Sequence, residues 1–418
     1  MAFISRIENE KNCIKEFEEL SKNYSCTDLG LGYPNYLPPN FVTKALSDVL
    51  SANHVEDHQY TSPNGLPRFT AALSKTYSKL ISRHLDQNSE ILVTAGSTEA
   101  LFCAIMSVVS PGDEVIIIEP YFSYFLTLVK LAGGIPKTLQ LKISNTENPT
   151  SENWEFDEEE LSGLISNKTK AIIVNTPHNP TGKVFSIEEL TAIAEFCNKW
   201  DLICISDEVY ERMVFKPKTH IRIASLPGMF ERTITIGAAE KCFSVTGWQI
   251  GFTYGPPTLI KNMQILHQYA VYNASTPLQV AFAKLFEKEY SKTNQPDSYF
   301  ESLEKDLREK RDFIVDCLRK NHFKPIVADG GMYVMADISD QASKTDLGNE
   351  EGEFVDQKFV KRLMKHHSLQ LFPVTVFCTP ENRKYYENYV RICFVKSKTT
   401  LDDAKEKLNK FEELEKNS

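Results

Sequence analysis

Short apolar segments that barely alternate with polar residues recur along the middle of the chain, and they restrict the possible folds more than any other feature. Each is rich in Ile and Val and reads as a strand: Ile91–Thr94, Val115–Glu119, Ala171–Asn175, Leu202–Ser206, Thr233–Ile236 and Phe252–Tyr254. A strand that is apolar throughout is buried on both faces, as in a parallel sheet covered by helices. We therefore expect residues 46–295 to form a large α/β domain with a mainly parallel sheet.

The segments between these strands have the signals of helices. One helix is predicted at Glu99–Val109, directly after a glycine and two hydroxyl residues. Ser186 opens the sequence Ser-Ile-Glu-Glu, a capping box that predicts a helix over Ile187–Trp200. Strands that alternate with helices in this way are typical of α/β proteins.

The rest of the chain has a different organisation. Residues 296–418 are predicted to form a smaller α+β domain, with helices at Tyr299–Arg319, Glu353–His366 and Thr400–Lys416 and strands at Tyr333–Asp337 and Tyr389–Val395. Residues 1–45 are expected to pack against this smaller domain.

Charge and cysteine usage narrow the function classes. A net charge of −9 argues against a nucleic-acid-binding surface, which requires clustered Lys and Arg. The nine cysteines form no C-x-x-C pair and no Cys/His cluster, which indicates free thiols and predicts no metal site. The sequence has no targeting pattern at its start and no apolar run of the ~18 residues that a membrane span needs. We therefore expect a cytoplasmic protein without a membrane partner.

Ala95-Gly96-Ser97-Thr98 follows the first predicted strand and precedes a helix. A glycine turn, two hydroxyls and a helix N-terminus can bind a phosphate group, because backbone N–H groups point at the anion. Ser97 or Thr98 could equally be an ordinary N-cap of that helix.

Two further loops follow predicted strands, where an open α/β sheet binds its ligands. In Thr176–Gly182, two prolines and a glycine fix Asn179, and His178 is interpreted as a loop histidine. Asp207 ends an apolar strand just before Tyr210. A buried Asp needs a cationic partner, although Asp207 as a helix N-cap explains its position equally well.

Lys241 follows the strand Thr233–Ile236 in an apolar, glycine-containing setting. Burial favours the neutral form of an amine, which can form a Schiff base. A phosphate-binding turn, an Asn and a Tyr that can anchor a ring, a buried Asp and a reactive Lys are together what pyridoxal 5'-phosphate (PLP) requires. The Asp pairs with the protonated pyridine nitrogen and keeps the ring an electron sink.

At this point the chain resembles the class I aminotransferases of PLP fold type I, and within them the branch of kynurenine aminotransferase, glutamine transaminase K and cysteine-S-conjugate β-lyase. The resemblance covers nearly the whole chain and rests on a set of motifs in a fixed order, among them Leu29–Pro34, Gln59–Thr61, Pro111–Val115, Glu119–Phe122, Asn175–Pro180, Ser206–Tyr210, Ala224–Thr235, Lys241–Gly251 and Tyr389–Phe394.

The resemblance implies a role for each matching residue on the cofactor side. Lys241 would hold PLP and act as general base and acid, with Asp207 on the ring nitrogen. Tyr210 and Asn179 would hydrogen-bond the ring oxygen, Phe122 would stack on the ring, and Ser97 and Thr98 would hold the phosphate.

The resemblance also implies a substrate subsite and a homodimer. Arg391 would bind the α-carboxylate of the substrate as a bidentate fork, with Gly32 and Asn179 beside it. Tyr60 would reach the phosphate of the neighbouring subunit. An L-amino acid would give its amino group to the cofactor and leave as a 2-oxo acid, and a second 2-oxo acid would take the group in a ping-pong cycle.

The chain departs from the family near the phosphate. Gln249 stands where the family has Lys or Arg, Ala238 where it has Ser, and Glu240 where it has a small residue. We therefore expect weakened binding of the PLP phosphate. In the donor pocket, Ile14 and Asn273 replace an aromatic residue and a histidine of the branch.

The leading hypothesis is an aminotransferase that uses kynurenine, glutamine, aromatic or sulfur-containing donors. One alternative is a cysteine-S-conjugate β-lyase working from the same site, which shares the proton abstraction. The other is a catalytically impaired relative that acts as a scaffold, a hypothesis motivated by Gln249, Ala238 and Glu240.

Overall fold

A seven-stranded sheet forms the centre of the computed structural model, which describes residues 13–292, 295 and 297–415. The strand order is β2-β10-β9-β8-β7-β3-β4. Their bounds are β2 Ile91–Thr94, β3 Glu114–Glu119, β4 Ile135–Gln140, β7 Thr169–Asn175, β8 Ile203–Asp207, β9 Thr233–Ala238 and β10 Gly251–Tyr254. All neighbouring strands pair in parallel except β10, which is antiparallel to both β9 and β2. The mainly parallel sheet expected from the sequence is confirmed.

The strand β4 was not predicted from the sequence. It lies at the edge of the sheet, and of its residues only Leu139 is fully buried. Because β4 is partly exposed along most of its length, it lacks the continuous apolar run that marks the other six strands, including β2 at the opposite edge.

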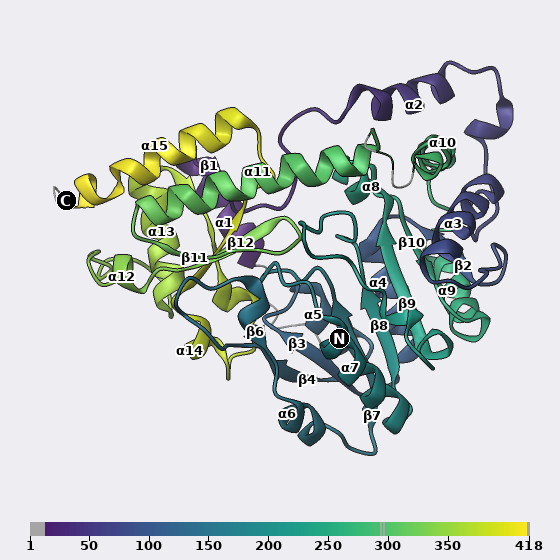
Figure 1. Ribbon diagram of the computed structural model, residues 1–418, viewed down its shortest axis with the longest axis horizontal. Coiled ribbons are helices and arrows are strands. Elements are labelled where there is room, and N and C mark those ends of the chain that lie inside the picture. Colours follow the sequence, from purple (N-terminus) through teal and green to yellow (C-terminus); the bar gives the residue numbers. More distant parts are fainter. Residues whose placement is uncertain (1–12, 293–294, 296, 416–418) are drawn as a thin grey trace, which may run out of the picture.

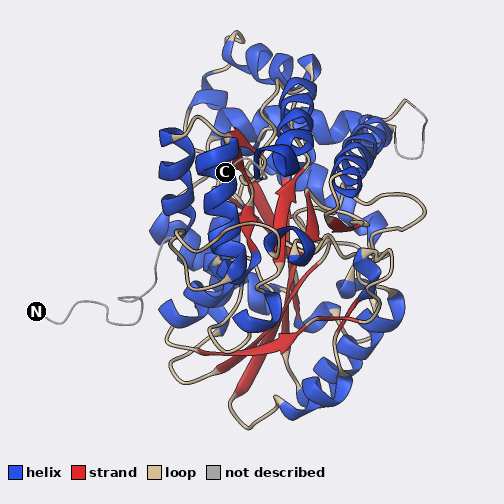
Figure 2. Cartoon of the chain, turned by 90° about the vertical axis from the view of Figure 1, so that its left-hand side faces the viewer, coloured by secondary structure: helices blue, strands red, loops and turns tan. Residues whose placement is uncertain are grey.

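Helices cover both faces of this sheet (Figure 2). Alternate residues of β3 show the two faces, because successive side chains of a strand point in opposite directions. Val115 and Ile117 belong to one hydrophobic core with α4 and α5, whereas Ile116 and Ile118 belong to another with α7. The helices of this part of the chain are α2 Asn40–Leu50, α3 Pro67–Leu80, α4 Ser97–Val108, α5 Tyr124–Leu131, α6 Glu158–Gly163, α7 Ile187–Trp200, α8 Ala239–Cys242, α9 Pro257–Ala270 and α10 Thr276–Ser291. The predicted capping box of α7 is present.

A second, antiparallel sheet has the order β11-β12-β15-β14. Its strands are β11 Lys324–Ile326, β12 Tyr333–Asp337, β14 Phe372–Pro373 and β15 Tyr389–Cys393. The helices around it are α11 Tyr299–Lys320, α12 Ser339–Ala342, α13 Val355–His367, α14 Arg383–Tyr386 and α15 Lys398–Glu415. In Figure 1 the helices α11 and α15 run side by side over this sheet.

The N-terminal segment packs against this second part of the chain. Strand β1 (Thr27–Asp28) pairs in parallel with β13 (Leu369–Gln370), and α1 (Cys13–Asn23) contacts α13. The boundaries at residues 45 and 295 stay a prediction. The remaining short elements are β5 Lys142–Ile143, β6 Trp154–Glu155 and the 3₁₀ helices Val55–His58, Ser151–Asn153, Ile223–Ser225, Phe230–Arg232, Thr246–Trp248 and Val374–Phe377.

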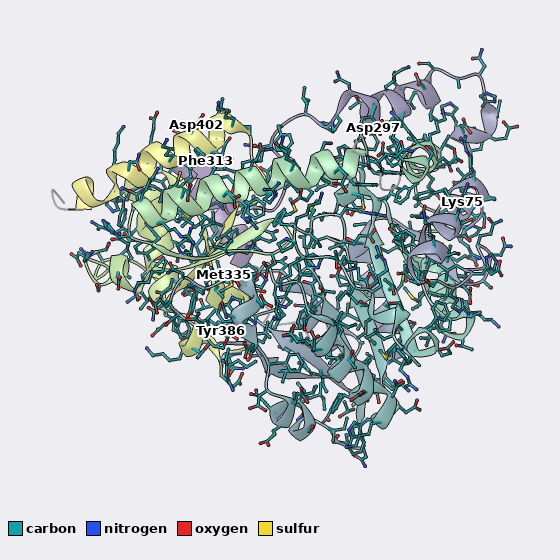
Figure 3. The ribbon with its side chains drawn as sticks, viewed as in Figure 1. Lys75, Asp297, Phe313, Met335, Tyr386 and Asp402 are labelled. Carbon is teal, nitrogen blue, oxygen red and sulfur yellow. The ribbon has the colours of Figure 1, made fainter. Side chains whose placement is uncertain are left out.

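The two sheets meet through a shared core, where Figure 3 labels Met335 of β12 and Tyr386 of α14. Both side chains are fully buried and belong to the same cluster as Ile116 and Ile118 of β3. The Tyr386 hydroxyl donates to the carbonyl of Leu141 at 2.6 Å. Packing across this junction fixes the second sheet next to the carboxyl ends of the parallel strands, where the candidate site lies.

Candidate active site

Three site segments follow the carboxyl ends of the parallel strands β7, β8 and β9, which lie side by side. Asn175 and Asp207 are register partners, and Asp207 pairs with Ile236 of β9. The Asn175 side chain donates to the Asp207 carbonyl at 3.0 Å. Lys241 lies on α8, the short helix that follows β9 directly. The adjacent carboxyl ends of these strands thus bring together the segments that carry Asn179, Asp207 and Lys241.

Asp207 is a buried acid, with only 3 % of its surface exposed. Its Oδ1 accepts from the Val209 N–H at 3.3 Å, and the residues after β8 form turns. The alternative explanation of Asp207 as a helix N-cap is therefore wrong. Burial raises the pKa of Asp207 to about 7, and the charge of Lys241 opposes that rise. Such a carboxylate requires a further cation to stay ionised.

Lys241 is half-buried. Among the described residues, its Nζ has no hydrogen-bond or ion-pair partner, although its charge acts on both Asp207 and Glu240. An amine that lies beside a buried acid without a bonded partner is available for a covalent bond to an aldehyde.

Arg391 of β15 is a buried cation, 5 % exposed, that faces the same region from the second sheet. Its two terminal nitrogens donate to Asn179 Oδ1 and to the Gly30 carbonyl, each at 3.0 Å. Its Nε is buried without a partner, and no carboxylate pairs with the guanidinium among the described residues. The rings of Tyr333 and Phe377 lie 4.0 and 4.4 Å from its central carbon. A buried guanidinium without an acid fits an anionic ligand.

Tyr333 contacts Arg391 and Tyr210 in the candidate site, although the sequence predicts only a strand at this position. Its ring lies edge-on to Tyr210, with centroids 6.4 Å apart, and the two hydroxyls influence each other's pKa. A Cβ added at Gly32 would lie 1.7 Å from the Tyr333 hydroxyl, so only glycine fits there. Burial raises the pKa of Tyr210 far above its usual value, and it stays protonated. A tyrosine inside an apolar strand gives no signal of which neighbours it will meet.

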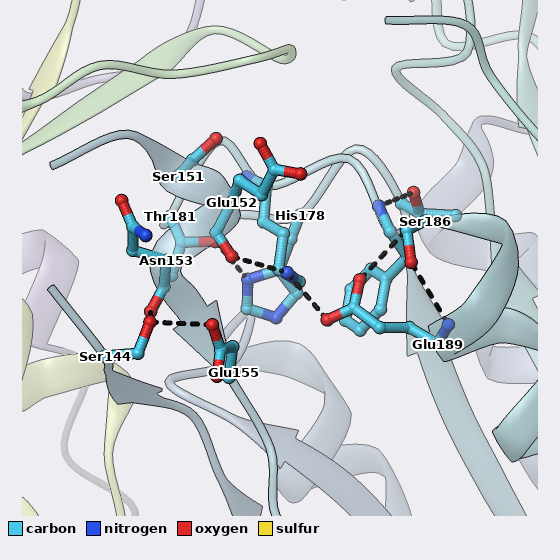
Figure 4. Close-up of polar contacts among 12 residues, drawn as sticks. Ser144, Ser151, Glu152, Asn153, Glu155, His178, Thr181, Ser186 and Glu189 are labelled. Carbon is cyan, nitrogen blue, oxygen red and sulfur yellow. Dashed lines mark hydrogen bonds and ion pairs between the residues drawn. The ribbon is translucent and has the colours of Figure 1, made fainter.

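The loop after β7 places Asn179 Oδ1 where it accepts a hydrogen bond from Arg391. Figure 4 shows His178 and Thr181 of this loop beside Ser186 and Glu189 at the start of α7. The Asn179 N–H donates to Asn175 Oδ1 at 2.8 Å. Lys183, 1 % exposed, pairs with Glu189 of the α7 capping box at 2.8 Å. His178 is buried against Thr181, and burial lowers its pKa to about 3. His178 is therefore neutral and structural, in agreement with its interpretation as a loop histidine.

The N-terminus of α4 has a glycine cap, with Gly96 at φ +83° and no side-chain cap bond. The explanation of Ser97 or Thr98 as N-caps is therefore wrong. Ser97 is half-buried and Thr98 is exposed. A Cβ at Gly251 would lie 2.5 Å from the Ser97 nitrogen, so β10 closes tightly over this turn.

The three departures from the family gather around this turn. The Gln249 side chain lies against Gly96, where an added Cβ would be 2.5 Å from its Oε1. Its Nε2 donates to the Thr246 carbonyl. Ala238 is the register partner of Gly251. The buried Glu240 carboxyl lies near the N–H and the hydroxyl of Ser97, and both groups lower its pKa.

Two expected cofactor residues lie apart from these contacts. Phe122 is half-buried, and its ring packs against Tyr124 and Phe125. Tyr60 is 82 % exposed, and its ring contacts the exposed ring of Tyr272 at 5.2 Å. Within one chain, the structure does not bring Tyr60 to the other site residues it describes.

A buried ion-pair network supports the loop after Asp207. Glu208, Glu211 and His220 lie close enough to share a cation, and Arg222 already pairs with Glu211. Burial alone would raise the pKa of Glu211, but Arg222, Arg212 and His220 lower it to about 2. The guanidinium of Arg222 thus supplies the cation that these acids need.

Comparison with known proteins agrees with this geometry. The sequence model of the aminotransferase class I and II family matches residues 24–408. Kynurenine--oxoglutarate transaminase 3 of Mus musculus is 44 % identical over 96 % of this chain and 88 % of its own length. Kynurenine--oxoglutarate transaminase 1 of Homo sapiens is 40 % identical over 95 % and 94 %.

Solved structures give the same result. N-succinyldiaminopimelate aminotransferase from Mycobacterium tuberculosis superposes with a TM-score of 0.86 at 30 % identity, over 98 % of this chain and 100 % of the other. Bna3p from Saccharomyces cerevisiae, a candidate kynurenine aminotransferase, reaches 0.91 at 28 % identity over 99 % of each chain.

The chain therefore belongs to the aminotransferase class I and II family and has the α/β architecture of fold type I. It is an aminotransferase of the kynurenine aminotransferase branch, and the comparisons favour this activity over the lyase and scaffold alternatives. No helix within the described part of the chain is long and apolar enough to cross a bilayer.

Proposed function

We propose that this aminotransferase works with pyridoxal 5'-phosphate bonded to Lys241, and that it moves the amino group of an L-amino acid to a 2-oxo acid. One observation carries the proposal. Lys241, which has no bonded partner among the described residues, lies near the buried Asp207, which forms no ion pair there. The buried Arg391, which has no acid to pair with among these residues, faces the same region.

The residues present fit this cofactor at its ring. Asp207 is desolvated and stays ionised only if it has a second cation beside it in addition to Lys241. The protonated pyridine nitrogen of PLP would be that cation. Tyr210 and Asn179 are protonated or neutral groups that could hydrogen-bond a ring oxygen. Ser97 and Thr98 stand at a helix N-terminus, where backbone N–H groups favour a phosphate. The acid at position 240 fits this end less well.

When bound, PLP supplies an electron sink for the negative charge that develops at the substrate Cα. Arg391 binds the α-carboxylate through its paired nitrogens and fixes the Cα–H bond relative to Lys241. The Lys241 Nζ removes the α-proton and returns it during the reverse half-reaction. The rings of Tyr333 and Phe377 pack against the guanidinium, which is 5 % exposed and therefore largely shielded from water.

The donors we propose are amino acids with aromatic, sulfur-containing or glutamine-like side chains, kynurenine among them. The similar proteins named as kynurenine--oxoglutarate transaminases support this class. Tyr121 is buried, and the ring of Tyr33, next to Gly32, lies 4.2 Å from the Lys396 ammonium. The Ile14 side chain lies outside the described residues, and Asn273 is half-buried.

A homodimer would complete the site. Tyr60, Tyr269, Val271 and Tyr272 expose apolar surface, and Tyr60 and Tyr269 are more than four-fifths exposed. Contiguous exposed aromatic residues are typical of interfaces between subunits. We propose that Tyr60 crosses this interface to the phosphate of the partner subunit. The eight described cysteines are all free, which supports a reducing compartment such as the cytoplasm.

A donor and acceptor screen on PLP-saturated protein tests the proposal. We expect transfer from kynurenine or a related donor to a 2-oxo acid, and no transfer after Lys241→Ala. Release of pyruvate and thiol from a cysteine conjugate without any 2-oxo acid would instead support the lyase. If no donor reacts with the saturated wild-type protein, the proposal fails.

A further inference from the structure

The N-terminus of α4 already holds a negative group of this chain. The carboxyl of Glu240 is 1 % exposed and interacts with both the N–H and the hydroxyl of Ser97, the first residue of the helix. These are the donors that a phosphate at this turn would use.

The Glu240 carboxyl is only partly satisfied there. Its Oε2 is buried and has no hydrogen-bond partner. A buried carboxyl oxygen without a donor is costly when charged, but in the protonated acid one oxygen becomes a donor itself. A protonated Glu240 could therefore give a hydrogen bond to an anion at the turn, whereas an ionised Glu240 would repel it.

We propose that Glu240 is a proton-linked ligand of the cofactor phosphate: it donates from the protonated carboxyl, and its ionisation weakens cofactor binding. The inference rests on the proposed PLP function and adds a regulation to it. When the phosphate binds, one proton from solvent binds the carboxylate, the N–H and hydroxyl of Ser97 donate to the phosphate, and the new O–H of Glu240 donates to a phosphate oxygen.

The surroundings place this ionisation near neutral pH. Burial raises the pKa of Glu240 to about 7, and the charge of Lys241 opposes the rise. From α4, Ser97 contributes only donors, and Glu99 of the same turn is directed to the Ala95 N–H and His267. From α8, the Cys242 thiol stays protonated because burial raises its pKa. Gln249 presents a neutral amide instead of a fixed cation.

The sign of the effect follows from these groups. Below pH 7 the carboxyl is protonated before the cofactor arrives, and no proton has to be taken up. Above pH 7 the free protein has lost that proton and must recover it, so the dissociation constant rises by up to about tenfold per pH unit.

The test compares PLP with pyridoxal, the same aldehyde without its phosphate. Dissociation constants of both are measured by equilibrium dialysis at pH 6.0 and 8.5 for the wild-type protein, Glu240→Gln and Glu99→Gln. The preference for PLP is the dissociation constant of pyridoxal divided by that of PLP. In this ratio the pH dependence of the bond to Lys241 cancels, because both aldehydes form that bond. What remains is the contribution of the phosphate subsite together with the second ionisation of the phosphate itself, near pH ~6, which is the same for the wild type and Glu240→Gln.

We expect the wild-type preference for PLP to fall by roughly ten- to thirtyfold between the two pH values, as a single linked proton requires. Glu240→Gln should reduce this fall to less than about threefold, because its amide is always neutral and can donate. Glu99→Gln, which neutralises the other acid of the same turn, should keep the wild-type fall.

A wild-type preference that does not change with pH, or an equal fall in Glu240→Gln, overturns the inference. Both aldehydes bonding to Lys241 in that case would leave the proposed function intact. If neither aldehyde bonds to Lys241, the proposed function fails and this inference fails with it.

Discussion

The two ends of the candidate site treat negative charge in opposite ways. At the carboxylate end, Arg391 is buried, unpaired with any acid that the structure describes, and held by neutral oxygens. At the phosphate end, the neutral amide of Gln249 stands where the family has a cation, and the buried Glu240 adds an acid. The first end is prepared for an anion in advance, whereas the second has to change its protonation state to accept one.

The two buried acids of the site make the same point. Burial raises the pKa of Asp207 and of Glu240 to about 7, and Lys241 opposes both shifts. A bound PLP would bring a cation to Asp207 and an anion to Glu240. Cofactor binding should therefore ionise the first acid and protonate the second, although they start alike.

The largest effect should come from removing the prepared cation. Arg391→Gln would lose the charge-assisted contacts with the substrate carboxylate, worth about 2–5 kcal/mol. We expect kcat/KM to fall by roughly thirty- to several-thousandfold in steady-state assays. The exposed Arg68→Gln, which breaks a surface ion pair with Glu287, is the control and should change kcat/KM by less than about twofold. Full activity in Arg391→Gln would show that the carboxylate binds elsewhere.

Asp207→Asn should reveal the cost of the buried acid in the protein without cofactor. Below pH ~3.9 the wild-type Asp207 carboxyl is protonated in both the folded and the unfolded protein. Between pH ~3.9 and about 7 it ionises in the unfolded protein but stays protonated in the folded one, which favours unfolding. The substitution should thus raise the free energy of unfolding by roughly 2–4 kcal/mol at pH 8, with little gain at pH 4.

Urea titrations at the two pH values measure this gain. Asp48→Asn, at an exposed ion pair of α2, should stay within about 0.5 kcal/mol of the wild type at both. A gain for Asp207→Asn that is the same at pH 4 and pH 8 would exclude the electrostatic cause.

Gln249→Lys should make the phosphate end more like the carboxylate end. A charge-assisted hydrogen bond contributes about 1.5–3 kcal/mol, so the affinity for PLP should rise about ten- to a hundredfold. Equilibrium dialysis measures this change, and pyridoxal, which has no phosphate, should gain nothing. An unchanged dissociation constant for PLP would refute the role of this position.

Tyr333→Phe is expected to have the smallest effect. It removes the hydroxyl that interacts with Tyr210 but keeps the ring over Arg391. One neutral hydrogen bond is worth about 0.5–1.5 kcal/mol, which predicts a two- to tenfold loss of kcat/KM. A loss as large as that of Arg391→Gln would mean that the hydroxyl contacts the substrate itself.

The sequence predicts most of the fold because inner parallel strands carry continuous apolar runs, and it misses β4, which faces solvent on one side. It also predicts which residues follow the strands toward the site. The contacts between segments that are distant in the sequence could not be predicted. Tyr333 meets Gly32 and Tyr210 only because two sheets pack together. Glu240 departs from the family already in the sequence, but its interaction with Ser97 depends on how two segments that are distant in the sequence pack together.

The central claim is that Lys241 is bonded to the cofactor, and reduction followed by peptide mapping tests it most directly. The protein is incubated with PLP, treated with borohydride, digested and analysed by mass spectrometry. We expect about one reduced cofactor per chain on the peptide that contains Lys241, and none on this peptide after Lys241→Ala. A label spread evenly over surface lysines, with Lys241 unmodified, would contradict the account.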